Sequence, residues 1–121
     1  MAYFIDLKTV TDNRGSLTVI EDALPFEVKR IYYIYGADGS RRAAHRHIQT
    51  VQATICLHGS CEVYNNNGEK KENFVLDDPS KCLILEPRDW HVMHNFSNEA
   101  VLLVLASSKY DKADYIHEEY K

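Results

Sequence analysis

The sequence predicts an all-β fold of the jelly-roll or sandwich type. Apolar residues fall in short runs separated by turn residues, with almost no helical periodicity before the last ten residues. About eight strands at this spacing fit two packed sheets or a barrel better than an alternating α/β sheet. The chain has 121 residues and a mass of 14.0 kDa, so we expect one domain over residues 1–121.

The strands are predicted from apolar and β-branched runs, and the turns from Asn, Asp, Gly, Ser and Pro. The expected strands are 16–20, 28–35, 50–57, 61–64, 73–76, 81–85, 91–96 and 101–107. Residues 65–68, Asn-Asn-Asn-Gly, predict a tight hairpin, because Asn and Gly tolerate the positive φ that such turns require. Only residues 111–120 are expected to form a short helical turn.

Composition excludes several classes of function. The formal charge is −4 and no basic stripe is present, so we expect no nucleic-acid partner. The longest apolar run, 100–106, is too short to span a bilayer, and residues 1–10 do not resemble a signal peptide. The three cysteines are an odd number without zinc-site spacing, which favours reduced thiols in a cytoplasmic protein.

Strand periodicity suggests which side chains face a pocket. In 50–57, the apolar residues alternate with Gln52, Thr54 and Cys56, so these three are expected to point into a pocket. His45 and His47 share a parity and project to one side if their segment is extended. By the same rule, Tyr33 and Tyr35 share the face opposite Tyr32, and one or more of these rings is expected to line the cavity.

Two imidazoles two residues apart on a strand can reach one bound molecule, which suits either metal ligation or proton transfer. For a metal, His91 could join His45 and His47 in a tris-histidine site. Gln52 argues against this, since a neutral amide cannot offset the charge of an ion. We therefore favour acid–base chemistry and expect no metal. The simplest alternative is that the two histidines lie on the rim of the fold, and that His117 is an ordinary surface residue.

The motif Gly39-(x)5-His45-x-His47-(x)4-Gln52-(x)6-Gly59 resembles the first motif of the cupin barrels. Gln52 stands where metal-binding cupins usually carry Glu. His91 and Asn95 keep the H-(x)3-N spacing of the second cupin motif, although Asp89 stands where Gly is usual. The resemblance implies a cupin jelly roll.

A series of blocks along nearly the whole chain resembles the WxcM-like/FdtA-like sugar 3,4-ketoisomerases. The blocks are Arg14-Gly15-Ser16-Leu17, residues 29–34, His45-x-His47, residues 56–60, Trp90-His91-x-Met93, residues 104–107, Tyr110-Asp111 and Asp114-Tyr115-Ile116. The resemblance implies a homodimer with exchanged N-terminal strands. It also implies that the carbonyl of a dTDP-4-keto-6-deoxyhexose moves from carbon 4 to carbon 3 without a metal or other cofactor, in deoxyamino-sugar biosynthesis.

The family usually shows Arg-Gly-x-His-Ala-His-Lys in the histidine motif. Here both histidines are kept, but Ala43, Arg46 and Ile48 replace the glycine, the alanine and the lysine.

The resemblance and the chemistry together give each candidate residue a role. His45 and His47 are the expected proton-transfer residues, with their order left open, and Tyr33 donates to the oxyanion or shuttles a proton. The expected substrate-binding residues are Arg30 and Arg42 for the diphosphate, with Gln52, Tyr35, Trp90 and His91. Two alternatives are a metal-dependent cupin enzyme and a non-catalytic cupin that binds a sugar nucleotide.

Overall fold

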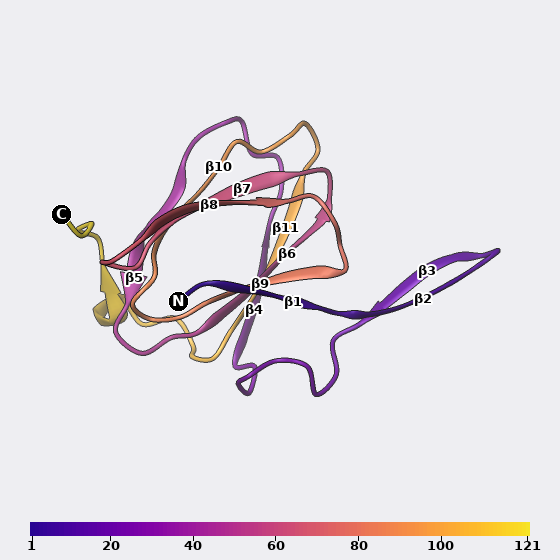
Figure 1. The fold of residues 1–121 in the computed structure, drawn as a ribbon, viewed down its shortest axis with the longest axis horizontal. Coiled ribbons are helices and arrows are strands. Elements are labelled where there is room, and N and C mark those ends of the chain that lie inside the picture. Colours follow the sequence, from indigo (N-terminus) through magenta and orange to yellow (C-terminus); the bar gives the residue numbers. More distant parts are fainter.

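Two five-stranded antiparallel sheets face each other in the computed structural model, which describes residues 1–121 (Figure 1). The first sheet has the order β1 (Tyr3–Asp6), β9 (Lys81–Leu85), β6 (Gln52–His58), β11 (Val101–Ala106) and β4 (Arg30–Ile34). The second has the order β12 (Tyr115–Ile116), β5 (Arg42–His47), β10 (Trp90–His94), β7 (Cys61–Asn66) and β8 (Lys71–Leu76). The predicted all-β cupin jelly roll is confirmed.

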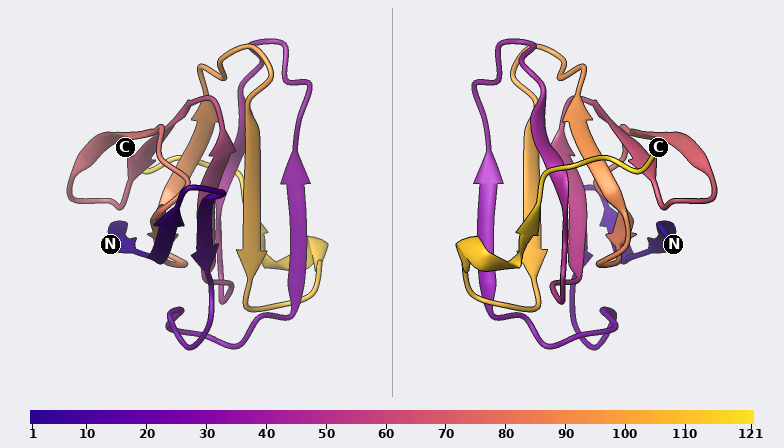
Figure 2. Two further views of the ribbon diagram at one scale, coloured as in Figure 1. Left: turned by 90° about the vertical axis from the view of Figure 1, so that its right-hand side faces the viewer. Right: turned by 90° about the vertical axis from the view of Figure 1, so that its left-hand side faces the viewer.

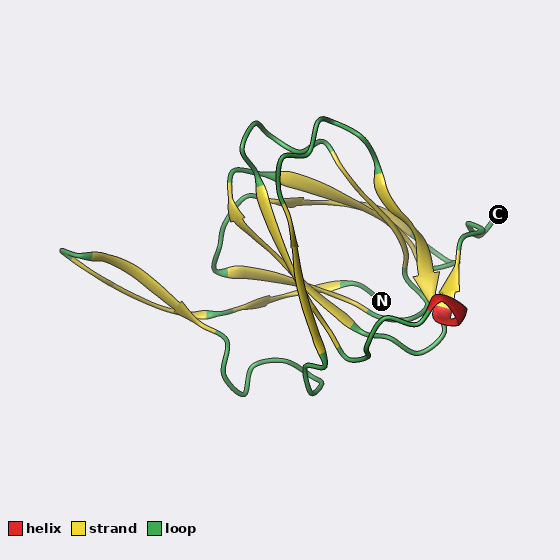
Figure 3. Ribbon diagram, turned by 180° about the vertical axis from the view of Figure 1, so that it is seen from behind, coloured by secondary structure: helices red, strands yellow, loops and turns green.

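All eight expected strands are present, with ends within two residues of the predicted ones. The strands β1, β5 and β12 were not predicted as such, nor was β2 (Lys8–Asp12). The pairing partners of β1, β5 and β12 are distant in sequence, whereas β2 pairs with the adjacent β3 and carries a mostly polar run. In 111–120 only a 3₁₀ turn, η1 (Lys112–Asp114), forms before β12 begins (Figure 3, red).

The apolar residues form two cores. The larger core lies between the two sheets, and the smaller one lies against the opposite face of the first sheet, under the segment 20–28. The larger contains Cys56, Cys61, Val63, Leu76, Leu83, Leu85, Met93, Phe96, Leu102 and Val104, and the smaller contains Leu7, Ala53, Ile55, Cys82, Ile84 and Leu105.

The two cores overturn one detail of the strand prediction. Because β6 is a central strand covered on both faces, Thr54 and Cys56 do not face a pocket. Thr54 donates a hydrogen bond to the carbonyl of Leu83 at 3.0 Å, and Cys56 belongs to the larger core.

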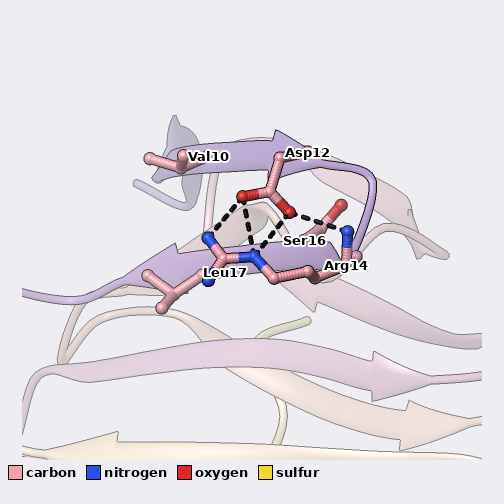
Figure 4. A pocket seen from close by; sticks show the side chains of 6 residues that line it. Val10, Asp12, Arg14, Ser16 and Leu17 are labelled. Atoms are coloured by element: carbon pink, nitrogen blue, oxygen red, sulfur yellow. Dashed lines mark hydrogen bonds and ion pairs between the residues drawn. The ribbon is translucent and has the colours of Figure 1, made fainter.

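A β-hairpin formed by β2 and β3 (Gly15–Val19) extends well away from the sheets (Figures 1 and 3), and Figure 2 looks along its length. Its strands pair only with each other, and the side chains of Val10 and Leu17 are 51% and 60% exposed. At its tip Arg14 forms an ion pair with Asp12 at 2.6 Å (Figure 4). The largest cavity, about 400 Å³, is lined by hairpin residues alone, so one side of the hairpin is hollowed and open.

The two ends of the chain are both held against the sheets. In the single chain, the N-terminal residues 3–5 pair with β9. The C-terminal segment crosses the outer face of the second sheet. There the indole Nε1 of Trp90 donates to the carbonyl of His117, and the hydroxyl of Tyr120 donates to the carbonyl of Arg88. No helix in the structure has the length and apolar character needed to cross a membrane.

Candidate active site

Strands β5 and β10 bring three imidazoles together on the inner side of the second sheet. His91 is the Cα partner of His45, so strand pairing itself makes these two neighbours. The ring centroids of His45 and His47 lie 4.9 Å apart, those of His45 and His91 5.2 Å apart, and those of His47 and His91 6.4 Å apart. The predicted common orientation of His45 and His47 is confirmed, and the alternative of two rim histidines is wrong because His47 is buried.

An irregular stretch of β5 precedes the histidines. Ala43 and Ala44 both have positive φ, 71° and 55°, and the pairing of β5 with β10 shifts register at this point. L-residues other than Gly adopt this conformation at a cost. The family's glycine would stand at Ala43, so this chain holds a strained backbone directly beside its histidines.

Hydrogen bonds define which ring nitrogen of each histidine carries hydrogen. The Nδ1 atoms of His45 and His91 donate to the carbonyls of Ala43 and Asp89, each at 3.0 Å. The Nδ1 of His47 donates to the carboxylate of Asp114 at 2.9 Å. In a neutral imidazole with hydrogen on Nδ1, the Nε2 atom is a free acceptor. The Nε2 atoms of His47 and His91 are buried without a partner, so both can accept a proton.

All three rings are neutral at pH 7. Burial, followed by the neighbouring imidazoles of His91 and His47, lowers the pKa of His45 to about 3. Burial also lowers the pKa of His91 to about 4. The pKa of His47 is lowered by burial too, although the carboxylate of Asp114 opposes the effect. The site therefore presents bases and not imidazolium ions.

Arg30 and Gln52 complete the inner surface around the histidines. Gln52 is buried, and its amide Nε2 donates to the hydroxyl of Tyr32 at 3.2 Å while its Oε1 has no partner. The guanidinium of Arg30 lies 4.5 Å from the centre of the Tyr32 ring and 3.5 Å from the hydroxyl of Tyr115. Gln52 thus orients the hydroxyl of Tyr32.

Three predicted site residues lie elsewhere. Tyr33 and Tyr35 are 62% and 71% exposed and stack on each other on the outer face of β4, so Tyr32 is the inward ring. Trp90 is buried on the face of β10 opposite His91, beneath the C-terminal segment. In all three cases strand alternation decides, because adjacent residues point to opposite faces. Arg42 is exposed at the start of β5, close enough for its charge to act on the hydroxyl of Tyr32.

The C-terminal segment contributes three residues that the residue-by-residue prediction did not assign to the site. The rings of Tyr115 and His117 lie 4.6 Å and 6.0 Å from that of His45, and Asp114 contacts His47. The block Asp114-Tyr115-Ile116 was one of those shared with the family, which was the available signal. Pairing of Tyr115 with His47 in β12 and β5 is what places the segment here.

The arrangement does not suit a metal ion. No group of three or more His, Cys, Asp or Glu side chains is placed so that it could hold one.

The histidines do not line a cavity of the single chain. The three cavities lie on the β2–β3 hairpin, on the outer face of the second sheet and along residues 20–28. The side chains of His45, His47 and Gln52 nevertheless all point to the inner side of the fold.

Comparison with known proteins assigns this site to a family. A family model described as FdtA, WxcM-like, C-terminal, matches residues 2–121. This chain belongs to the FdtA family. The TDP-4-oxo-6-deoxy-alpha-D-glucose-3,4-oxoisomerase of Aneurinibacillus thermoaerophilus is 42% identical over 117 residues, which cover 94% of this chain and 84% of that one.

Solved structures of FdtA-like ketoisomerases have the same fold. The QdtA 3,4-ketoisomerase of Thermoanaerobacterium thermosaccharolyticum, a double mutant in complex with TDP, superposes with a TM-score of 0.94 at 40% identity, over 97% of this chain and 87% of that one. A His-to-Asn mutant of QdtA, 38% identical with a TM-score of 0.93, was solved with TDP-4-keto-6-deoxyglucose, covering 97% of this chain and 87% of that one. The WlaRB TDP-quinovose 3,4-ketoisomerase of Campylobacter jejuni gives a TM-score of 0.92 at 41% identity, over 97% and 92%.

Proposed function

We propose that this protein is a 3,4-ketoisomerase that moves the carbonyl of TDP-4-keto-6-deoxyglucose from carbon 4 to carbon 3. The observation that carries the proposal is the cluster of three neutral imidazoles, two of which present a buried, unpartnered Nε2. Proton transfer to and from carbon needs such bases. The activities of the relatives, at 38–42% identity over nearly the whole chain, select the reaction.

The chemistry needs only proton movements. The 4-keto group acidifies the hydrogen on carbon 3, so a base removes it and the electron pair of the C–H bond forms an enediolate. A proton then returns to carbon 4, oxygen 4 takes up a proton to become the new hydroxyl, and oxygen 3 loses its hydroxyl hydrogen as it becomes the new carbonyl. Carbon 3 is oxidised and carbon 4 is reduced within one molecule, so the balance is complete without an external oxidant or reductant.

Cations near the histidines fit the negative charges of substrate and intermediate. The guanidinium of Arg30 lies near His47, over the ring of Tyr32 and next to the hydroxyl of Tyr115, where it can stabilise the enediolate oxygens. The exposed side chain of Arg42 is placed to bind the diphosphate through charge-assisted hydrogen bonds. We assign the roles expected for Tyr33, Tyr35 and Trp90 to the inward-facing rings of Tyr32 and Tyr115.

Incubation with TDP-4-keto-6-deoxyglucose in deuterium oxide, followed by NMR, tests the function directly. An isomerase yields a 3-keto sugar with deuterium at the carbon that is reprotonated. A non-catalytic sugar-nucleotide binder instead retains TDP affinity and introduces no deuterium. Loss of the activity on dialysis against a chelator, with recovery on adding a divalent metal, would favour the metal-dependent alternative.

We further propose that the working form is a homodimer in which the β2–β3 hairpin contacts the second copy. A lone two-stranded ribbon is marginally stable in water, and this one exposes Val10 and Leu17 beside an open hollow. An equally exposed apolar strip lies on β4 and directly after it, formed by Ile31, Tyr33 and Tyr35. Large exposed apolar patches mark interaction surfaces.

Light scattering tests the dimer. The native protein should give twice the 14.0 kDa chain mass, and Leu17→Asp should weaken the association. Val75→Asp is the matched control, because Val75 is similarly exposed, at 55%, but lies on β8 of the second sheet, away from the hairpin. A native species of 14.0 kDa alone at working concentration contradicts the proposal.

We place this activity in the cytoplasm. Cys56, Cys61 and Cys82 are all buried and unpaired, as expected in a reducing compartment. Fractionation of the source cells would test this placement.

A further inference from the structure

The carboxylate of Asp114 is the most heavily hydrogen-bonded group near the histidines. Its Oδ2 accepts hydrogen bonds from the Nδ1 of His47, at 2.9 Å, and from the hydroxyl of Thr50. Its Oδ1 accepts from the backbone N–H groups of Ile48 and Gln49, at 3.1 and 2.9 Å. Four donors from the end of β5 and the following turn thus hold one buried carboxylate in a single orientation.

The charge of this carboxylate is retained in the folded protein. Burial acts to raise the pKa of Asp114, but the hydrogen bonds from Thr50, Gln49 and His47 outweigh burial and hold the pKa below its ordinary value. An ionised carboxylate therefore faces the ring of His47. Its side chain is only a few percent exposed, as is that of His47, so water screens the pair little.

His47 differs from the other two histidines in this partner. His45 and His91 donate from Nδ1 to neutral backbone carbonyls, whereas His47 donates to a carboxylate. Both kinds of acceptor select the tautomer with hydrogen on Nδ1, but only a carboxylate supplies negative charge to stabilise an imidazolium. Among the three rings, His47 is thus the one that is built to carry a proton.

We propose that Asp114 is a positioning residue that fixes His47 with Nε2 toward the substrate and supports its positive charge while it holds the sugar proton. The proposal rests on the ketoisomerase function proposed above. In the step, Nε2 of His47 takes the proton from carbon 3, and the C–H electron pair passes into the enediolate. The hydrogen on Nδ1 stays on His47 and Asp114 stays ionised, so the imidazolium can then release its proton toward carbon 4 or to solvent.

Asp114→Asn tests the proposal, because an amide keeps the shape of the side chain and removes its charge. The matched control is Asp111→Asn, the same chemical change three residues earlier, at an exposed carboxylate that caps η1 by accepting from the N–H of Ala113. We expect Asp114→Asn to lower kcat by roughly 100- to 10,000-fold, which is the usual contribution of general acid–base catalysis. The upper end is the loss seen when the carboxylate of a catalytic triad is neutralised. TDP affinity should change less than about threefold, and the control should behave as the native protein.

Two readouts separate positioning from general structural support. In ¹⁵N NMR of the imidazoles, with His47 identified by its loss in His47→Asn, the native ring should show hydrogen on Nδ1 and none on Nε2. The double variant His47→Asn with Asp114→Asn should have a kcat within about threefold of that of His47→Asn alone. The reason is that substitutions in residues that act as a unit do not have additive effects.

Several results would overturn the role of Asp114. These are a native His47 with hydrogen on Nε2, an Asp114→Asn variant with native kcat, or a double variant whose losses multiply. Should Asp114→Asn fail to fold, the tautomer of native His47 still decides, since it needs no variant at that position. A native protein with the expected tautomer that fails to isomerise the sugar would instead contradict the proposed function and leave the His47–Asp114 geometry standing.

Discussion

His91 should make the stability of this fold depend on pH. Its ring is fully buried and its Nε2 has no partner, so protonation in the folded state places an uncompensated charge in the interior. Burial lowers the pKa of His91 from 6.5 to about 4. Between these two pH values the unfolded chain binds more protons than the folded one, and therefore the free energy of unfolding falls as the pH falls.

The size of the effect follows from the two pKa values. Proton uptake by the unfolded chain alone, integrated from pH 7 to pH 5, lowers the free energy of unfolding by about 2 kcal/mol through His91. The effect is nearly absent above pH 7 and is complete only below the folded-state pKa of about 4. For a domain of this size, about 2 kcal/mol is a large share of the total stability.

Urea unfolding at pH 7 and pH 5 measures this difference. The variant His91→Asn keeps an amide nitrogen near the position of Nδ1, which can still donate to the carbonyl of Asp89, and does not titrate. It should be less stable than the native protein at pH 7 but should lose about 2 kcal/mol less on acidification. His58→Asn, at the exposed last residue of β6, is the control and should follow the native curve. An equal loss in native protein and His91→Asn would refute the assignment of a buried neutral imidazole.

Three further predictions follow from the same geometry. His45→Asn and His47→Asn should each slow turnover by roughly 100- to 10,000-fold while TDP binding persists. If calorimetry shows that TDP affinity falls as much as turnover does, the histidines are ligand-positioning residues. Tyr32→Phe should lower the free energy of unfolding by about 1–3 kcal/mol, because it removes the buried hydrogen-bond partner of the Gln52 amide. Tyr33→Phe, on the exposed face, should change the free energy of unfolding by less than about 0.5 kcal/mol. The opposite order of the two variants in thermal melts would place Tyr33 inside. Ala43→Gly should raise stability by about 1 kcal/mol, because it relieves a φ of 71°; a lower melting temperature would show that no strain is stored there.

The fold and the histidine pair were predictable because both depend on local pattern. Alternating apolar runs and turn residues determine where strands begin and end, and the spacing of His45 and His47 puts both rings on one face of any extended segment. The motif spacing also selected His91 over His94, which the structure leaves outside the cluster, bonded to Asn73 on the outer side.

What failed was the assignment of faces to neighbouring residues. Tyr33, Tyr35 and Trp90 each lie one residue from an inward side chain, and strand alternation turns that single step into the opposite side of a sheet. A sequence block shared with a family identifies such a stretch but not which of its rings faces inward.

The all-β class, the strand positions and the pair of histidines that carry the proposed chemistry follow from local patterns in the chain. The residues that surround this pair depend instead on how distant segments pack. His91 reaches it through the register of β10 on β5, and Asp114 reaches it from 67 residues along the chain through the pairing of β12 with β5. Such contacts are set by the packing of distant segments around a common core, so no local pattern in the chain encodes them.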